Sequence, residues 1–183
     1  MAEQGTGTMQ QSYDGVAKAL HWAIMILLLP LLWYGFQAED LPKEDKLGFF
    51  QNHSGIGLVI LVLMIARLVW RRMHPVPPLP VTTPRWQQIA SKATHHGLYT
   101  LVILQPLFGL LLTTTSKGNL HPFGLFGLHI TENEFLHETG ETLHAINAYV
   151  ITALITLHVL AALYHHFISR DNVLKRMLPF VKA

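Results

Sequence analysis

The sequence predicts an all-α protein: an integral membrane four-helix bundle with both termini on the cytoplasmic side. Half of its 183 residues are hydrophobic and only 13% are charged, whereas a typical soluble domain carries about 25% charged residues. The apolar residues gather in four runs, each close to the roughly 20 residues that a helix needs to cross a bilayer. Basic and acidic residues are separated along the chain, which indicates how these helices are oriented.

The four expected helices cover about residues 16–37, 51–73, 93–115 and 141–168. No Asp or Glu lies deep within any of them, and the alternation expected of a membrane barrel is absent. Residues 1–14 are polar and lack the apolar core of a signal peptide, so we expect a flexible tail there and one membrane domain over 15–183. Residues 73–85 are rich in proline. The connection 118–140 includes the apolar segment 123–128, and we expect a short helix on the membrane surface within this connection.

The charge pattern predicts the orientation through the positive-inside rule. The basic residues of the segments expected in the cytoplasm are Arg71, Arg72, Arg85 and Lys92 in the middle connection, and Arg170, Lys175, Arg176 and Lys182 in the C-terminal tail. The two opposite connections hold Lys43, Lys46 and Lys117 among the acidic residues Glu39, Asp40, Glu44, Asp45, Glu132, Glu134, Glu138 and Glu141. We therefore expect a multi-pass protein of an inner membrane, with the middle connection in the cytoplasm. The net charge of +2 gives no indication of nucleic-acid binding.

The chain has twelve histidines and no cysteine. The missing cysteines exclude disulfides, Fe–S clusters, thiolate ligation and covalently attached haem. Histidine is then the main metal ligand that remains. Because a histidine within a membrane span is costly unless it is bonded, each one there is a candidate functional residue.

Four histidines form a pattern. His144 and His158 are fourteen residues apart, so they share one face of the fourth helix at depths about 21 Å apart. His21 lies near the cytoplasmic start of the first helix, and His53 lies near the outer start of the second. Two imidazoles from facing helices are what a six-coordinate haem needs. We therefore expect two haem b groups, one held by His21 and His158 and the other by His53 and His144.

Several alternatives stay open from the residues alone. An isolated histidine can instead hydrogen-bond to a neighbouring helix, and His137 shares a face with His144 and competes with it as the outer ligand. His95 and Arg71 are candidates for contacts to a haem propionate or to a quinone, although Arg71 also fits a role in topology alone. Gly55 and Gly57 are expected where a flat porphyrin approaches the helix backbone. Di-iron, zinc-hydrolase and metal-transport patterns are not found.

The chain resembles the bacterial cytochrome b561 family over roughly residues 13 to 180. The strings that carry the resemblance are Ala17-Lys18-Ala19-Leu20-His21-Trp22, Asn52-His53-Ser54-Gly55-Ile56-Gly57 with Arg67 and Arg71-Arg72, His95-His96-Gly97-Leu98-Tyr99 with Pro106 and Gly109, and Leu157-His158 with His165-His166, Arg170-Asp171-Asn172 and Met177-Leu178-Pro179.

The resemblance implies a di-haem electron-transfer protein linked to ubiquinone or another membrane quinone. It implies a quinone-reducing oxidoreductase, with superoxide or a periplasmic protein as the electron donor. Related cytochrome b subunits anchor hydrogenases and other dehydrogenases, so the alternative is a membrane anchor that is inactive alone. The segment 118–140 is the part that does not match the family pattern.

Overall fold

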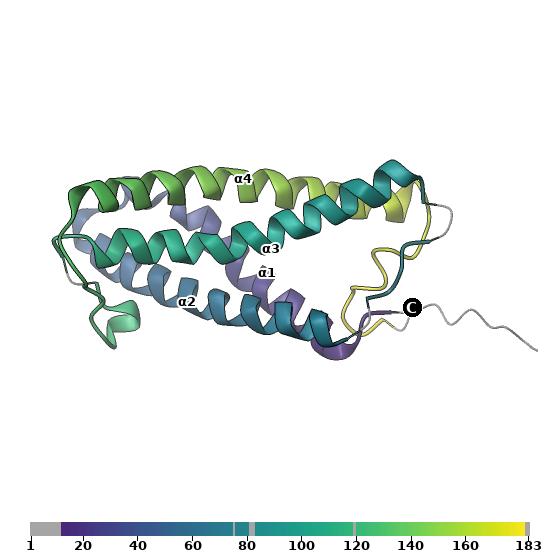
Figure 1. Cartoon of the computed structure of the whole chain (residues 1–183), viewed down its shortest axis with the longest axis horizontal. Helices are drawn as coiled ribbons and strands as arrows, with labels where there is room; N and C mark the ends of the chain where they lie inside the picture. Colours follow the sequence, from purple (N-terminus) through teal and green to yellow (C-terminus); the bar gives the residue numbers. More distant parts are fainter. Residues whose placement is uncertain (1–11, 75, 81–82, 119, 182–183) are drawn as a thin grey trace, which may run out of the picture.

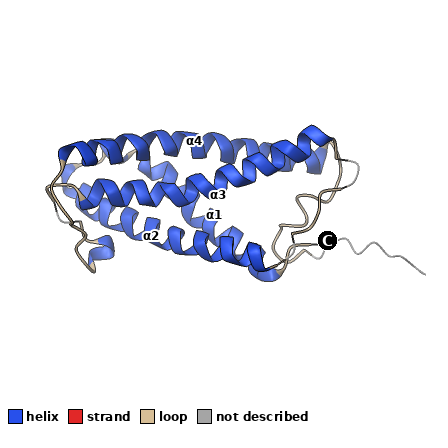
Figure 2. Cartoon of the chain, in the orientation of Figure 1, coloured by secondary structure: helices blue, strands red, loops and turns tan. Residues whose placement is uncertain are grey.

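The computed structural model describes residues 12–74, 76–80, 83–118 and 120–181. Four long helices run up and down in chain order (Figure 1): α1 Gly15–Gly35, α2 Lys43–Met73, α3 Arg85–Thr114 and α4 Glu134–Phe167. Two short 3₁₀ helices, η1 Ala38–Asp40 and η2 Pro122–Gly124, lie in the connections. The described part of the chain is helix and loop (Figure 2), with a single isolated bridge between Leu120 and Leu128.

The predicted all-α fold with four apolar helices is confirmed, because all four helices are long and apolar enough to cross a membrane. Three of them begin earlier than the apolar pattern predicted, at Lys43, Arg85 and Glu134. Their first turns are polar and extend beyond the apolar runs, so the pattern showed the spans and not the helix starts. Most of the predicted tail, residues 1–11, lies outside the described residues, as does Lys182.

Local chemistry explains where the helices begin. The side chains of Asp14 and Asn133 cap α1 and α4 by accepting hydrogen bonds from the N–H groups of Ala17 and Leu136, which satisfies donors that a helix leaves free at its start. Proline precedes both α2 and α3, at Pro42 and Pro84, in an extended conformation from which the helix then starts.

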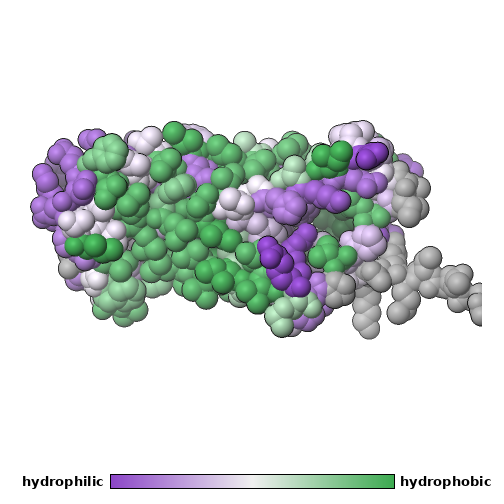
Figure 3. All heavy atoms as spheres, in the orientation of Figure 1, coloured by the Kyte–Doolittle hydropathy of each residue, from purple (hydrophilic) through white to green (hydrophobic). Residues whose placement is uncertain are grey.

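The helices form a bundle in which α3 packs on α4, α1 on α2, and α2 on α3. Gly140 of α4 lies so close to α3 that a Cβ there would be 2.7 Å from the backbone nitrogen of Leu112. Many large apolar side chains of the helices are exposed, and on the face that Figure 3 shows they cover the middle of the bundle, with polar residues toward both ends. A core of seven apolar side chains lies inside the bundle: Ile24, Leu28, Ile60, Met64, Val102, Ile151 and Ile155.

One end of the bundle holds the start of α1, the connection from α2 to α3 and the C-terminal segment (Figure 1). The C-terminal segment folds back onto α1, because the indole of Trp22 donates to the carbonyl of Met177 and the Lys18 ammonium donates to the carbonyl of Val181, both at 2.9 Å. In the connection 118–140, where a short surface helix was predicted, the structure has the 3₁₀ turn Pro122–Gly124, and Phe123 within it has left-handed angles.

Candidate functional site: two histidine pairs in the bundle

The four histidines predicted as ligands lie in two pairs at two levels of the bundle. His53 of α2 faces His144 of α4 with ring centroids 6.1 Å apart. His21 of α1 faces His158 of α4 with ring centroids 6.4 Å apart. We call these the outer pair and the inner pair. Each pair joins two helices that are far apart in the chain.

The apolar core separates the two pairs. Ile151 is fully buried and lies midway along α4 between His144 and His158. The pairs are therefore about 21 Å apart along α4 at about 1.5 Å per residue, with packed aliphatic side chains between them. Among the described residues no group of three or more His, Cys, Asp or Glu is placed to hold a metal ion.

All four helices repeat the fourteen-residue spacing that the sequence analysis noted only on α4. The residues at these positions are His21 and Gly35 on α1, His53 and Arg67 on α2, His95 and Gly109 on α3, and His144 and His158 on α4. Fourteen residues make close to four helical turns, so each helix presents the same face at both levels. The outer level therefore combines two histidines with two glycines, and the inner level combines three histidines with an arginine.

The two glycines of the outer level leave room for the imidazoles. A Cβ on Gly35 would be 3.3 Å from the His53 ring, and a Cβ on Gly109 would be 3.3 Å from the His144 ring. Gly55 and Gly57, which the sequence analysis predicted to lie beside a porphyrin, do not contact these imidazoles. A Cβ on Gly55 would meet the ring of Phe123 instead, and Gly57 has open space beside it.

A buried polar network holds His144. Its Nδ1–H donates to the backbone carbonyl of Gln105 at 3.0 Å, and the Gln105 side-chain amide donates to the carbonyl of His144 at 3.0 Å. The Asn147 amide donates to Gln105 Oε1 at 2.7 Å and to the carbonyl of Leu101 at 2.9 Å. Since the Nδ1 hydrogen is held by α3, the Nε2 lone pair of His144 is free to bind a ligand.

The sequence analysis missed Gln105 and Asn147. The available signal was two amide side chains within apolar runs, where polar groups are costly and usually bonded. His53 differs from its partner, because its Nδ1 is buried and has no hydrogen-bond partner in the structure.

The inner level carries more polar groups than the outer level. The Arg67 guanidinium donates to Nδ1 of His21 at 2.9 Å. His95 lies against His158 with ring centroids 5.2 Å apart, and its Nδ1–H donates to the carbonyl of Ser91 at 2.6 Å. Each ligand candidate of this pair therefore contacts a second polar side chain from another helix.

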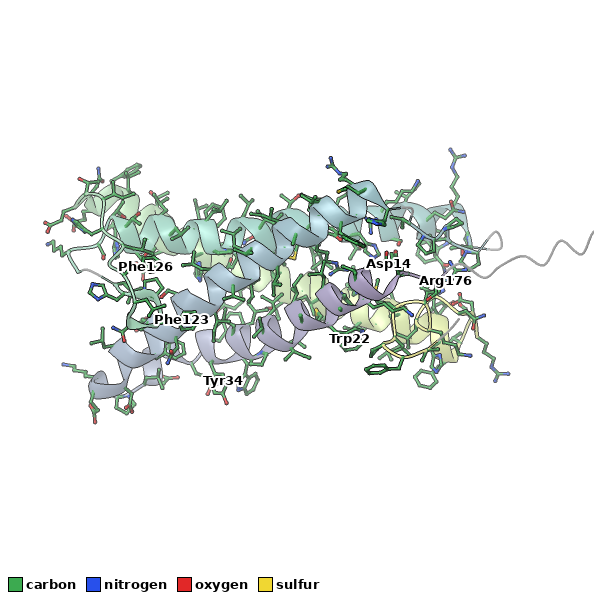
Figure 4. All side chains as sticks on the ribbon, turned by 90° about the horizontal axis from the view of Figure 1, so that it is seen from below. Asp14, Trp22, Tyr34, Phe123, Phe126 and Arg176 are labelled. Atoms are coloured by element: carbon green, nitrogen blue, oxygen red, sulfur yellow. The ribbon has the colours of Figure 1, made fainter. Side chains whose placement is uncertain are left out.

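A shallow pocket opens beside the inner level. It is lined in part by Asp14, Arg67, Arg71 and Tyr99, and both guanidinium groups lie over the Tyr99 ring, at 5.4 and 5.5 Å from its centroid. Figure 4 shows Asp14, Trp22 and Arg176 gathered at this end of the bundle. Burial opposes ionisation of Asp14, but hydrogen bonds from the Ala17 N–H and the Trp70 indole outweigh it and hold its pKa below the ordinary value.

The remaining histidines have other partners or lie at the surface. His137, the competitor for the outer site, donates from Nδ1 to the carbonyl of Leu112 at 3.0 Å. His165 pairs with Asp171 at 2.5 Å, and His74 stacks on Trp70 with ring centroids 3.8 Å apart.

Comparison with known proteins gives consistent results. The family model described as prokaryotic cytochrome b561 matches residues 12–180. The chain is 29% identical to "Probable superoxide oxidase CybB" of Yersinia pestis over 174 residues, which covers 93% of this chain and 98% of that protein. It is 30% identical to "Cytochrome b561 homolog 2" of Escherichia coli over 179 residues, 92% of each chain. It is also 28% identical to "Cytochrome b562" of Cereibacter sphaeroides over 178 residues. With its four apolar helices and this match over nearly its whole length, the chain belongs to the prokaryotic cytochrome b561 family of membrane electron-transfer proteins.

Proposed function

We propose that the chain binds two haem b groups and carries electrons between its outer side and the quinone pool. The family implies haem b. Two sites are supported by the two histidine pairs, in which the ring centroids are 6.1 Å apart in the outer pair and 6.4 Å apart in the inner pair. When bound, haem supplies a one-electron couple between ferric and ferrous iron. The residues hold and orient each group.

The distances fit an iron atom between two imidazoles. A metal–nitrogen bond of about 2.0 Å on each side, with about 1.1 Å from nitrogen to ring centroid, gives a centroid separation of roughly 6.2 Å. Both pairs are close to this value. The 5.2 Å between His95 and His158 is too short, which favours His21 as the partner of His158. The Nδ1 of His53 is buried and has no hydrogen-bond partner in the structure, so this ring has room for one more polar interaction.

Arg67, Arg71 and His95 are assigned supporting roles at the inner site. A neutral imidazole that binds iron through Nε2 carries its hydrogen on Nδ1, so Arg67 must then leave Nδ1 of His21 for another acceptor. A haem propionate is such an acceptor, and Arg71 lies on the same pocket to help bind it. His95 donates its Nδ1–H to the carbonyl of Ser91, so its other nitrogen can donate to a propionate or to a quinone carbonyl only when the ring is protonated.

The basic residues of the middle connection and of the C-terminal tail support an orientation with both termini in the cytoplasm of an inner membrane. The start of α1, the C-terminal segment as far as residue 181 and the arginine-rich connection between α2 and α3 lie at one end of the bundle (Figure 1), and cytoplasmic connections carry an excess of Lys and Arg. The inner pair then lies nearer the cytoplasm, and the outer pair lies nearer the periplasm. The membrane domain comprises residues 15–183.

Superoxide is our candidate electron donor, with ubiquinone as the acceptor. The support is the name of the Yersinia pestis relative, which is 29% identical. The acidic residues of the outer connections weigh against steering of an anion. A membrane anchor of a larger dehydrogenase is the second candidate, because cytochrome b subunits of this kind serve several complexes.

Two measurements on the purified full chain test the proposal. Reduction with dithionite must give sharp b-type α and Soret bands, and a chain without them contradicts haem binding. Superoxide supplied to the haem-loaded protein in quinone-containing vesicles must then reduce quinone faster than in protein-free vesicles. A haem-loaded chain that is inert in this assay supports the anchor instead.

A further inference from the structure

The segment from Leu120 to Leu128 forms a small hairpin beside α2 that none of the roles above uses. The N–H of Leu128 donates to the carbonyl of Leu120 at 3.0 Å and closes the hairpin. At its turn, Phe123 and Gly124 have φ angles of 52° and 73°. A phenylalanine in this left-handed region is strained by about 1 to 3 kcal/mol and persists only where the surroundings hold it.

The contact that holds the hairpin is on α2. Pro122 is fully buried, and the Phe123 ring lies on Gly55, where a Cβ would be only 2.5 Å from two ring carbons. A glycine is therefore needed at this place in α2 for the ring to fit. The ring packs two residues from His53, on the turn of α2 that carries the outer ligand. Figure 4 shows Phe123 and Phe126 at the end of the bundle opposite Asp14 and Arg176.

This contact lies at the depth of the bilayer. Gly55 is separated from Arg71, in the last turn of α2, by about 24 Å along the helix axis at about 1.5 Å per residue. The hydrocarbon core of a bilayer is about 30 Å thick. With Arg71 at one membrane surface, Gly55 and the ring upon it lie within the opposite half of the core or at its edge.

The tip of the hairpin has the chemistry of a lipid-facing segment. Leu125 is 76% exposed and Phe126 is 51% exposed, and no charged residue occurs between His121 and His129. The N–H groups of Gly124, Leu125 and Leu128 are bonded within the hairpin, so these donors do not require water. Exposed apolar surface of this kind marks a binding face.

We propose that residues 120–128 lie in the leaflet at this end of the bundle, with the hairpin backbone at the membrane interface, the side chains of Leu125 and Phe126 in lipid and Phe123 wedged on α2. The lipid of the bilayer therefore covers this apolar surface. The hairpin then separates lipid from the turn of α2 that carries His53. This inference concerns the hairpin's surroundings and does not depend on haem binding or on the electron donor.

The chain has no cysteine, so single-cysteine variants of the full chain can carry a spin label at one chosen position. Three labelled variants in phosphatidylcholine–phosphatidylglycerol vesicles test the proposal. Leu125→Cys reports on the hairpin, Val62→Cys on a lipid-facing position of α2 that is 66% exposed, and Glu132→Cys on the exposed connection before α4. Collisions with oxygen report lipid, and collisions with a water-soluble nickel chelate report water.

We expect the Leu125 label to match the Val62 label, with high oxygen and low nickel collision rates. A match to the Glu132 label overturns the proposal, because the tip is then in water. Low collision rates with both probes also overturn it, because the tip is then covered by protein, either a partner or a second copy. Phe126→Cys repeats the measurement if Leu125→Cys does not insert. Adding Phe123→Ala to the Leu125→Cys variant must shift the label toward water.

Discussion

Replacing Asn147 with leucine is expected to weaken the outer haem site and to leave the inner site intact. Asn147 is 5% exposed, and its amide bridges Gln105 Oε1 and the carbonyl of Leu101. Gln105 in turn bonds His144 through its own amide and its backbone carbonyl. Leucine has a similar volume but no hydrogen-bond donor, so the substitution breaks the hydrogen-bond network that holds the His144 imidazole.

The magnitude follows from the bonds that are lost. Two hydrogen bonds between α3 and α4 disappear, and such bonds average about 0.6 kcal/mol each in membrane proteins. Gln105 Oε1 is also left buried without a donor, which adds about 1 kcal/mol. The total is about 2 kcal/mol, and at about 1.4 kcal/mol per factor of ten it weakens haem binding at the outer site by at most about 30-fold. Loss of a group that orients a metal ligand typically costs about 10- to 100-fold in affinity.

The assay is retention of each haem when the purified protein is mixed with an excess of a haem-scavenging apoprotein. The inner haem of the same molecule is the internal control, and the matched variant is Thr152→Val on α4. Thr152 donates to the carbonyl of Ala148 within its own helix, so its loss removes a polar group but no link to α3. Equal loss of both haems from Asn147→Leu, or loss no faster than from Thr152→Val, refutes the positioning role. The midpoint potential of the outer haem must also shift in Asn147→Leu.

Two further predictions concern the outer imidazole and the start of α1. Gly109→Ala places a Cβ 3.3 Å from the His144 ring and must alter the low-spin electron paramagnetic resonance signal of the outer haem. Gly57→Ala is the control and must leave this signal unchanged, because the Cβ there meets open space. Identical spectra of the two variants contradict the tight fit of Gly109 against His144. Asp14 has a depressed pKa in the folded protein, so its ionised form stabilises α1 above its unfolded pKa of about 3.9, and this contribution is lost as the pH falls through the lower folded value. Thermal midpoints of the wild type and Asp14→Asn should therefore differ at pH 7 and converge in acid; a constant difference across this range contradicts the role of Asp14.

The sequence was sufficient to predict the spans and the shared face of His144 and His158, because the spans depend on the length of the apolar runs and the shared face depends on the helical period. About 20 apolar residues predict a span wherever they occur, and a spacing of fourteen residues puts His144 and His158 on one face of any helix. The true starts of α2, α3 and α4 could not be read in the same way. Their first turns lie beyond the apolar runs, where polar residues suit a helix and a loop equally well.

Contacts between segments that are distant in the chain could not be predicted from the sequence. Gly55 follows His53 closely and was expected to face a porphyrin, but the long connection from α3 to α4 brings the Phe123 ring onto it. Gly35 and Gly109, which do adjoin the outer imidazoles, are distant in the chain from the histidines that they accommodate. Their role depends on how neighbouring helices are aligned, and the apolar pattern of each helix alone does not give that alignment.

The central claim is that the outer and inner histidine pairs each hold one haem, and counting haem per chain in single variants tests it most directly. The pyridine haemochrome of the wild-type protein should give about two haems per chain, and His144→Ala and His158→Ala should each give about one. The haem that remains should differ between the two variants in its spectrum and potential. His137→Ala is the control and should keep both haems, since its imidazole is bonded to the carbonyl of Leu112. Unchanged haem content in both His144→Ala and His158→Ala would contradict the account.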